Sequence, residues 1–304
     1  MIEEKNLKKA LKYFERNLNN CTMCARNCHV NRTIQKGFCG QGVQAKISGA
    51  LLHFGEEPPL VDKNGAGAVF FVGCGMRCVY CQNFAFSHLN HGKEISDEEL
   101  ARLFISLQRS GAQTLDLVTP EPHLYAIISA LLKASREGFT LPIVFNTSSY
   151  VNVETLKELD GIVDIYLADI RYTNDEFSLK YSASPEYWEI TQKALREMYR
   201  QVGAFNSEKM KGLIVRHLIL PNGISGTRKA MRFVAEELST SVPISLMSQY
   251  FPVYKAKKIP ELSRKITEEE YEQALSIVEG YGLRGWYQPW GEKENNVYAK
   301  SIHW

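Results

Sequence analysis

The feature that most constrains the fold is an alternation of apolar and amphipathic segments from residue 66 onward. The run at 68–72 is continuously apolar, as expected for a strand buried on both faces. Six strands are predicted, at 68–72, 114–118, 143–145, 163–167, 213–219 and 243–246. Helices are predicted at 97–110, 122–136, 153–159, from 185, at 226–238 and from 267. This order predicts an α/β fold with a parallel sheet, and it leaves open whether the sheet is open or closed into a barrel.

The ends of these helices carry recognisable capping signals. Ser96 with Glu99, and Thr267 with Glu270, form capping boxes. Ser184 followed by Pro185 predicts the start of the helix from 185. Before residue 66, apolar residues at helical spacing predict one helix over 3–18, and the stretch at 40–65 has no regular pattern.

Composition excludes several function classes. The 304 residues include 36 Lys plus Arg and 34 Asp plus Glu, so the net charge is +2 and gives no strong pull toward nucleic acid. The charged start has no apolar signal region, and the apolar runs are shorter than the roughly 20 residues that a membrane span needs. We therefore expect a cytoplasmic protein with no membrane or nucleic-acid partner.

Seven cysteines fall into two groups, and none follows residue 81. An odd number argues against a closed disulfide framework, and clusters in an intracellular chain are usually metal-binding or catalytic. The second group is Cys74, Cys78 and Cys81, directly after the first predicted strand. Three thiolates in eight residues can hold a [4Fe–4S] cluster and leave one iron open. The alternatives are a zinc site completed by His88 or His91 and a chance clustering of the three cysteines.

The first group is a complete set of four thiols with the spacing C-x2-C-x3-C-x10-C. Its members are Cys21, Cys24, Cys28 and Cys39. Four thiolates suit structural Zn²⁺ or an auxiliary [4Fe–4S] cluster, and spacing alone does not decide between them. Disulfides or free thiols are the third alternative. The segment has few helix or strand signals, so we expect it to fold around a metal.

The C-x3-C-x2-C spacing, with an aromatic residue before the last cysteine, resembles the radical S-adenosylmethionine (SAM) superfamily. The chain is more narrowly similar to pyruvate formate-lyase-activating-enzyme-like proteins with an N-terminal cysteine cluster. The similar stretches are CTMCARNCHVNR, VGCGMRCVYCQN, LDLVTPEPH, IVFNTSSY, VDIYLADIRY, GLIVRHLILP and SLMSQY. The resemblance implies a partial (β/α)6 barrel over 66–304, behind a metal-binding segment at 1–65. It also implies that SAM binds the open iron of the Cys74, Cys78 and Cys81 cluster.

The resemblance further implies SAM contacts at strand ends, where barrel enzymes place functional residues. These residues are Tyr80, Glu121, Asn146, Thr147, Asp169, Arg171 and Arg216. Glu121 would accept from the SAM ammonium, Asp169 from a ribose hydroxyl, and Arg216 would neutralise the carboxylate. Where the family often reads Gly-Gly-Glu-Pro, this chain has Thr119 and Pro120 in place of the glycines. The alternatives are an ordinary turn at Glu121 and a structural ion pair between Asp169 and Arg171.

The activity implied is reductive cleavage of SAM to a 5′-deoxyadenosyl radical, which abstracts hydrogen from a substrate. Activating enzymes use it to make a glycyl radical on a partner enzyme, and they take the electron from a donor such as flavodoxin or ferredoxin. The rival hypothesis is a non-catalytic iron–sulfur or zinc-binding regulatory protein, which needs no SAM pocket.

Overall fold

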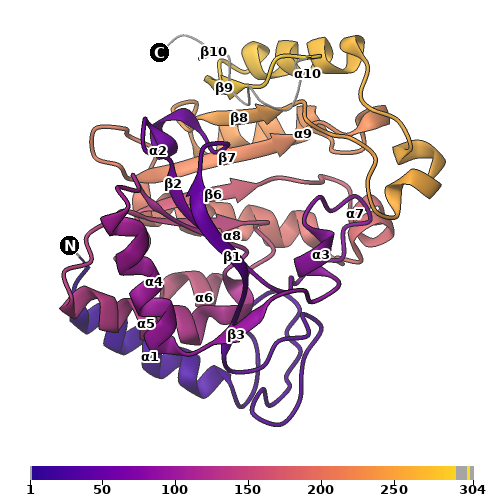
Figure 1. Cartoon of the computed structure of the whole chain (residues 1–304). Helices are drawn as coiled ribbons and strands as arrows, with labels where there is room; N and C mark the ends of the chain where they lie inside the picture. The colour runs from indigo at the N-terminus through magenta and orange to yellow at the C-terminus, as the bar shows by residue number, and fades with distance from the viewer. Residues whose placement is uncertain (1, 292–299, 302–304) are drawn as a thin grey trace. The chain divides into compact units, whose positions relative to one another are not determined.

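The computed structural model describes residues 2–291 and 300–301 (Figure 1). Internal contacts group the chain into two compact units. The first contains Met1–Gly75 and Asn83–Tyr166, and the second contains Met76–Gln82 and Leu167–Trp304. The segment boundaries predicted from the sequence, 1–65 and 66–304, remain predictions.

The first unit is built on five strands, in the order β3-β1-β2-β4-β5. They are β1 (Ala45–His53), β2 (Ala66–Phe71), β3 (Lys93–Ile95), β4 (Leu115–Val118) and β5 (Ile143–Thr147). The central strands β2, β4 and β5 are parallel, and β1 runs antiparallel to both β2 and β3. The apolar run predicted at 68–72 forms most of β2, in which all residues but Phe70 are buried. Every residue of β4 and β5 is also buried.

The helical segments of the first unit are α1 (Glu4–Asn17), α2 (Pro58–Val61), α3 (Phe84–Ser87), α4 (Asp97–Arg109), the 3-10 turn Glu121–His123, α5 (Leu124–Arg136) and α6 (Val153–Lys157). Three of them, α1, α4 and α5, form one layer, because α5 packs against both α1 and α4 (Figure 1). Ser96 and Glu99 close the predicted capping box of α4.

The second unit has the strand order β6-β7-β8-β9-β10. Its strands are β6 (Ile165–Asp169), which begins at the end of the first unit, β7 (Gly212–Leu218), β8 (Ile244–Met247), β9 (Gly285–Tyr287) and β10 (Lys300–Ser301). Strands β7, β8 and β9 are parallel, and β10 is antiparallel to β9. The six predicted strands are thus confirmed as β2, β4, β5, β6, β7 and β8.

Helices alternate with these strands. They are α7 (Asp175–Ser182), α8 (Tyr187–Val202), α9 (Thr227–Phe233) continued by a π-helical turn at Val234–Leu238, and α10 (Glu268–Gly280). Short 3-10 turns lie at Pro221–Gly223, Ala256–Lys258 and Pro260–Leu262. Thr267 and Glu270 form the predicted capping box of α10. The α/β class with a parallel sheet is confirmed.

Two expectations about local structure were wrong. The stretch at 40–65, expected to be irregular, contains β1, whose residues are mostly half-exposed and so form no apolar run. The helix predicted from Pro185 begins at Tyr187 instead, because Glu186 adopts a left-handed conformation with φ of 53°. The Ser184 hydroxyl donates back to the Ser182 carbonyl rather than capping that helix.

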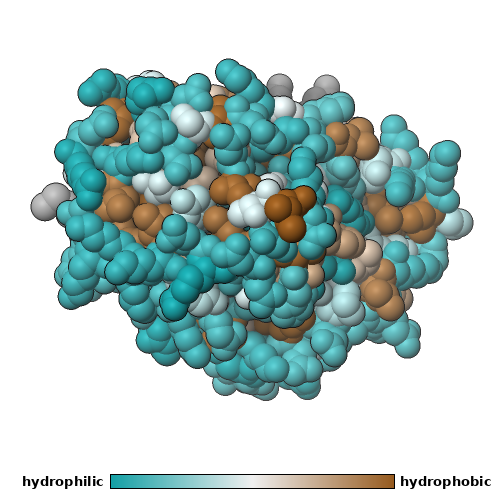
Figure 2. Space-filling model, turned by 90° about the horizontal axis from the view of Figure 1, so that it is seen from below, coloured by the Kyte–Doolittle hydropathy of each residue, from teal (hydrophilic) through white to brown (hydrophobic). Residues whose placement is uncertain are grey.

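In the described residues, no helix has the length and apolar character to span a membrane. On the face drawn in Figure 2, hydrophobic residues are scattered among hydrophilic ones.

Candidate functional site

The loop after β2 carries the three cysteines of the C-x3-C-x2-C motif. Cys74 belongs to the first unit, and Cys78 and Cys81 belong to the second. In the second unit, the amides of Arg77 and Val79 donate to the carbonyls of Ser182 and Tyr181, at 2.9 and 2.8 Å. These bonds fix the middle of the loop to the end of α7.

The sulfur of Cys78 is buried and receives two donors. The Ser182 hydroxyl donates to Cys78 Sγ at 3.0 Å, and Nη1 of Arg171 lies 3.5 Å from the same sulfur. Ser182 also shares a 2.7 Å hydrogen bond with the hydroxyl of Tyr172. Donors of this kind favour a negatively charged sulfur, which is the form that binds iron.

Arg171 and Asp169, predicted to contact SAM, form an ion pair at the end of β6. Nε and Nη2 of Arg171 both donate to Oδ2 of Asp169, at 3.0 and 2.6 Å. Tyr187 supports the same turn, because its hydroxyl donates to the Asp169 carbonyl and accepts from the Arg171 amide. Asp169 and Arg171 therefore form an ion pair in this structure, and Arg171 also reaches the Cys78 sulfur. The SAM contacts of the two residues stay predictions.

Tyr80 lies in a buried aromatic cluster. Its ring is edge-on to Tyr172 at 6.3 Å and to Tyr250 at 5.8 Å between ring centroids. The Tyr250 hydroxyl donates to the Leu262 carbonyl at 2.7 Å, which anchors the segment after β8. The aromatic residue before Cys81 thus has a packing role in the second unit.

Neighbouring residues of β7 face different environments. Arg216 is partly exposed, whereas His217 is fully buried, in agreement with the predicted alternation. His217 Nδ1 donates to the Ile170 carbonyl at 2.9 Å, so Nε2 accepts from the Thr227 hydroxyl at 3.0 Å. Burial lowers the pKa of His217 to about 4, which keeps the ring neutral.

Glu121, Asn146 and Thr147 come together in the first unit. The Thr147 hydroxyl donates to Oε1 of the buried Glu121, and Asn146 Nδ2 donates to Asp116 at 3.3 Å. Thr119, which stands where the family resemblance implies glycine, adopts φ of 58° and its amide donates to the Asn146 carbonyl at 3.0 Å. The backbone therefore keeps a conformation suited to glycine despite the β-branched side chain.

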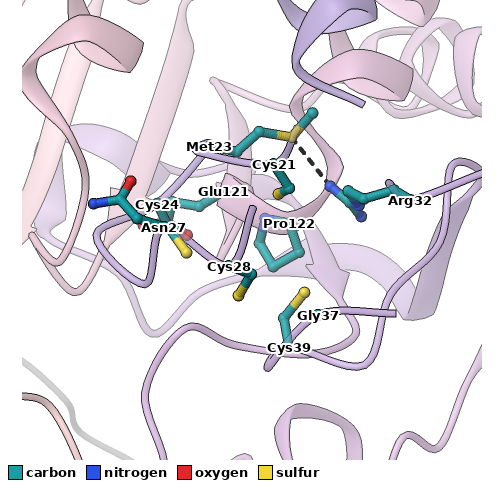
Figure 3. A pocket seen from close by; sticks show the side chains of 10 residues that line it. All are labelled: Cys21, Met23, Cys24, Asn27, Cys28, Arg32, Gly37, Cys39, Glu121 and Pro122. Carbon is teal, nitrogen blue, oxygen red and sulfur yellow. Dashed lines mark hydrogen bonds between the residues drawn. The ribbon is translucent and has the colours of Figure 1, made fainter. Parts of the chain in front are cut away.

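The four N-terminal cysteines line one small cavity of about 10 Å³ (Figure 3). Its lining residues are Cys21, Met23, Cys24, Asn27, Cys28, Arg32, Gly37, Cys39, Glu121 and Pro122. All four cysteines are thiols and form no disulfides with one another. The sequence did not predict that Glu121 borders this pocket, because Glu121 is 82 residues beyond Cys39 (121 − 39).

The charge state of the pocket depends on its burial. Burial raises the pKa of the Cys24 thiol well above its usual value, and the neighbouring Cys39 raises it further. Burial also raises the pKa of Cys39, which Arg32 opposes. Among the described residues, no three His, Cys, Asp or Glu side chains already surround one point that could hold a metal.

A family model described as the Radical SAM superfamily matches residues 68–206. The Uncharacterized protein MJ0674 of Methanocaldococcus jannaschii is 33% identical over 274 residues, which cover 87% of this chain and 75% of that protein. The chain belongs to the radical SAM superfamily. Membership implies a [4Fe–4S] cluster and SAM.

Two further similarities agree with this assignment. The pyruvate formate-lyase-activating enzyme of Clostridium pasteurianum is 29% identical over 180 residues, covering 56% of this chain and 68% of that enzyme. A radical SAM methyltransferase from Sphaerobacter thermophilus matches in structure with a TM-score of 0.52 and 13% identity. That match covers 77% of this chain and 69% of the methyltransferase, and it confirms the radical SAM barrel fold.

Proposed function

We propose that this protein uses a [4Fe–4S] cluster on Cys74, Cys78 and Cys81 to cleave SAM, and that it makes a glycyl radical on a partner protein. The observation that carries the proposal is the cysteine motif at the end of β2, inside the region matched by the family model. The residues fit such a cluster, because one short loop supplies three thiols and the Cys78 sulfur already accepts from Ser182 and Arg171.

Cys74, Cys78 and Cys81 would hold the cluster, which would supply the electron for cleavage of SAM into methionine and a 5′-deoxyadenosyl radical. The protein's task is to orient SAM and to exclude water from the reaction. Tyr80, Glu121, Asn146, Thr147, Asp169, Arg171 and Arg216 remain the proposed SAM contacts. The bonds of Glu121 to Thr147 and of Asp169 to Arg171 would fix these carboxylates before SAM arrives.

The proposed substrate is a backbone glycine of a partner polypeptide. The similarity to a pyruvate formate-lyase-activating enzyme supports this class. An electron donor such as flavodoxin or ferredoxin, and a metal (zinc or a second cluster) at Cys21, Cys24, Cys28 and Cys39, complete the proposal. The rival, a regulator that binds metal without catalysis, predicts no consumption of SAM.

The test is electron paramagnetic resonance of reduced protein mixed with SAM and a glycyl radical enzyme from the same source. We expect a stable organic radical on the partner, with one 5′-deoxyadenosine formed per radical. The same mixture with the partner's radical-site glycine changed to alanine should give none. If SAM is cleaved to 5′-deoxyadenosine but no radical forms on the partner, the substrate assignment is wrong. The assignment of radical SAM chemistry would still hold.

A further inference from the structure

The size of the four-cysteine pocket favours a single small cation. Its cavity of about 10 Å³ is close to the space that one water molecule needs. One Zn²⁺ ion binds four thiolates at about 2.3 Å and requires no other atoms. A [4Fe–4S] cluster would have to fit four irons and four sulfides between the same thiols.

The pocket also contains a buried positive charge. Arg32 lines the cavity and is only 4% exposed, and its Nε has no hydrogen-bond partner among the described residues. One of its other nitrogens donates to Met23 Sδ at 3.1 Å (Figure 3), and the other donates to the Gly42 carbonyl at 2.5 Å. Burying an uncompensated charge is unfavourable. Four thiolates around one divalent ion carry a net negative charge, which would compensate Arg32.

The backbone around the pocket is already held in place. Asn152 Nδ2 donates to the carbonyls of Thr22 and Cys24, at 2.7 and 3.0 Å. The Phe38 amide donates to Cys28 Sγ at 3.4 Å, a contact that stabilises a thiolate ligand. Residues other than the four cysteines thus hold the backbone of the segment in place around the pocket.

The same segment contacts the cluster loop on both sides of Cys74, within the first unit. Arg26 Nε donates to the Gly75 carbonyl at 2.6 Å, and a Cβ at Gly75 would lie 3.2 Å from Cys24 Sγ. Gly73 has φ of 84°, and a Cβ there would lie 2.6 Å from the Cys39 carbonyl oxygen. The neighbours of one proposed cluster ligand therefore pack directly on the N-terminal cysteines.

We propose that the four-cysteine pocket takes one Zn²⁺ ion, and that the loaded pocket braces the loop at 73–75 so that Cys74 retains the cluster. The bracing half rests on the proposed function, since it assumes that Cys74 is a cluster ligand. The zinc half stands on the pocket alone.

The zinc half is tested on the full chain with Cys74, Cys78 and Cys81 all changed to Ala, so that only the N-terminal thiols remain. We expect one Zn²⁺ per chain, and Co²⁺ in its place should show the absorption of a tetrahedral thiolate site. Anaerobic reconstitution with iron and sulfide should add no cluster. Incorporation of about four irons with sulfide would overturn the zinc assignment.

The bracing half is tested by the rate at which an iron chelator strips the cluster from zinc-loaded protein. Arg26→Ala removes the bond to Gly75 without removing a thiol, and Arg109→Ala removes an exposed arginine of α4 as a control. We expect iron loss to be several-fold faster in Arg26→Ala and unchanged in Arg109→Ala, with one zinc retained in both. Equal rates in parent and Arg26→Ala would overturn the brace.

A second pair of variants tests the brace from the side of the cluster loop. Gly75→Ala places a methyl group against Cys24 Sγ, whereas Gly49→Ala in β1 meets no atom within 4 Å. We expect Zn²⁺ to bind about tenfold more weakly to Gly75→Ala and with the parental affinity to Gly49→Ala. Parental affinity in both variants would overturn the proposal that the cluster loop packs on the zinc site. A parent that binds zinc but assembles no cluster would refute the proposed function and leave the zinc site intact.

Discussion

At the scale of single residues, the most informative contact is that of Ser182 with Cys78. Ser182 lies 101 residues beyond Cys81 (182 − 81), and no motif marks it. It reaches the sulfur only because α7 ends beside the loop and exchanges backbone bonds with it. Asp169 and Arg171 could be predicted because the family resemblance implies functional residues at strand ends, whereas Ser182 requires the fold.

We predict that Ser182→Ala lowers the reduction potential of the cluster without loss of iron. A hydrogen bond to a charged group contributes about 1.5–3 kcal/mol. The reduced cluster carries more negative charge on its sulfur atoms than the oxidised cluster does. Removal of the donor therefore destabilises the reduced cluster more, which lowers the potential. The matched control is Ser178→Ala, a buried serine of the same helix that bonds only to backbone carbonyls in the described contacts. A redox titration in which Ser182→Ala and Ser178→Ala shift the potential equally would contradict the role of this donor.

His217 makes stability depend on pH. Its folded pKa of about 4 lies below the roughly 6.5 of an unfolded chain, so the unfolded state takes up its proton first. The contribution of neutral His217 to the free energy of unfolding is complete above pH 6.5 and is lost as the pH falls through 4. The loss is on the order of 3 kcal/mol. A nuclear magnetic resonance titration should find the ring neutral at pH 5.5, and protonation near pH 6.5 would contradict this assignment.

At the scale of elements, strands buried on both faces were predictable and half-exposed ones were not. β1 has one buried residue, Ala45, and therefore shows no apolar run. Helix α7 was missed for a similar reason, because its buried positions are Ser178, Tyr181 and Ser182, which form no apolar stripe. The pattern of hydrophobicity reports burial, so elements that bury polar or few side chains carry little signal.

The end of β4 holds a strained residue whose replacement has a predictable effect. Thr119 has φ of 58°, a region that costs a β-branched residue about 1–3 kcal/mol. We therefore expect Thr119→Gly to raise the free energy of unfolding or leave it unchanged, although glycine usually destabilises a strand end. Thr114→Gly, just before the same strand, is the control and should destabilise, since its buried hydroxyl donates to the Leu60 carbonyl. The free energy of unfolding is measured by urea denaturation. If Thr119→Gly loses as much stability as Thr114→Gly, the backbone at Thr119 is not strained.

At the scale of the whole molecule, the sequence predicted the parallel α/β order and both cysteine groups. It did not predict that the N-terminal thiols would share a pocket with Glu121 and contact Gly73 and Gly75. Such contacts join residues far apart in the chain, and local periodicity carries no information about them. The family resemblance supplied the SAM contacts, and the structure adds the partners that hold Glu121 and Asp169 in place.

The central claim is that this chain cleaves SAM at a cluster held by Cys74, Cys78 and Cys81. The most direct test is 5′-deoxyadenosine formation by anaerobically reconstituted protein with SAM and dithionite. We predict formation by the parent, none by Cys78→Ala, and a requirement for about tenfold to a hundredfold more SAM in Arg216→Ala. No 5′-deoxyadenosine from a parent with a full cluster, or equal amounts from the parent and Cys78→Ala, would contradict the claim.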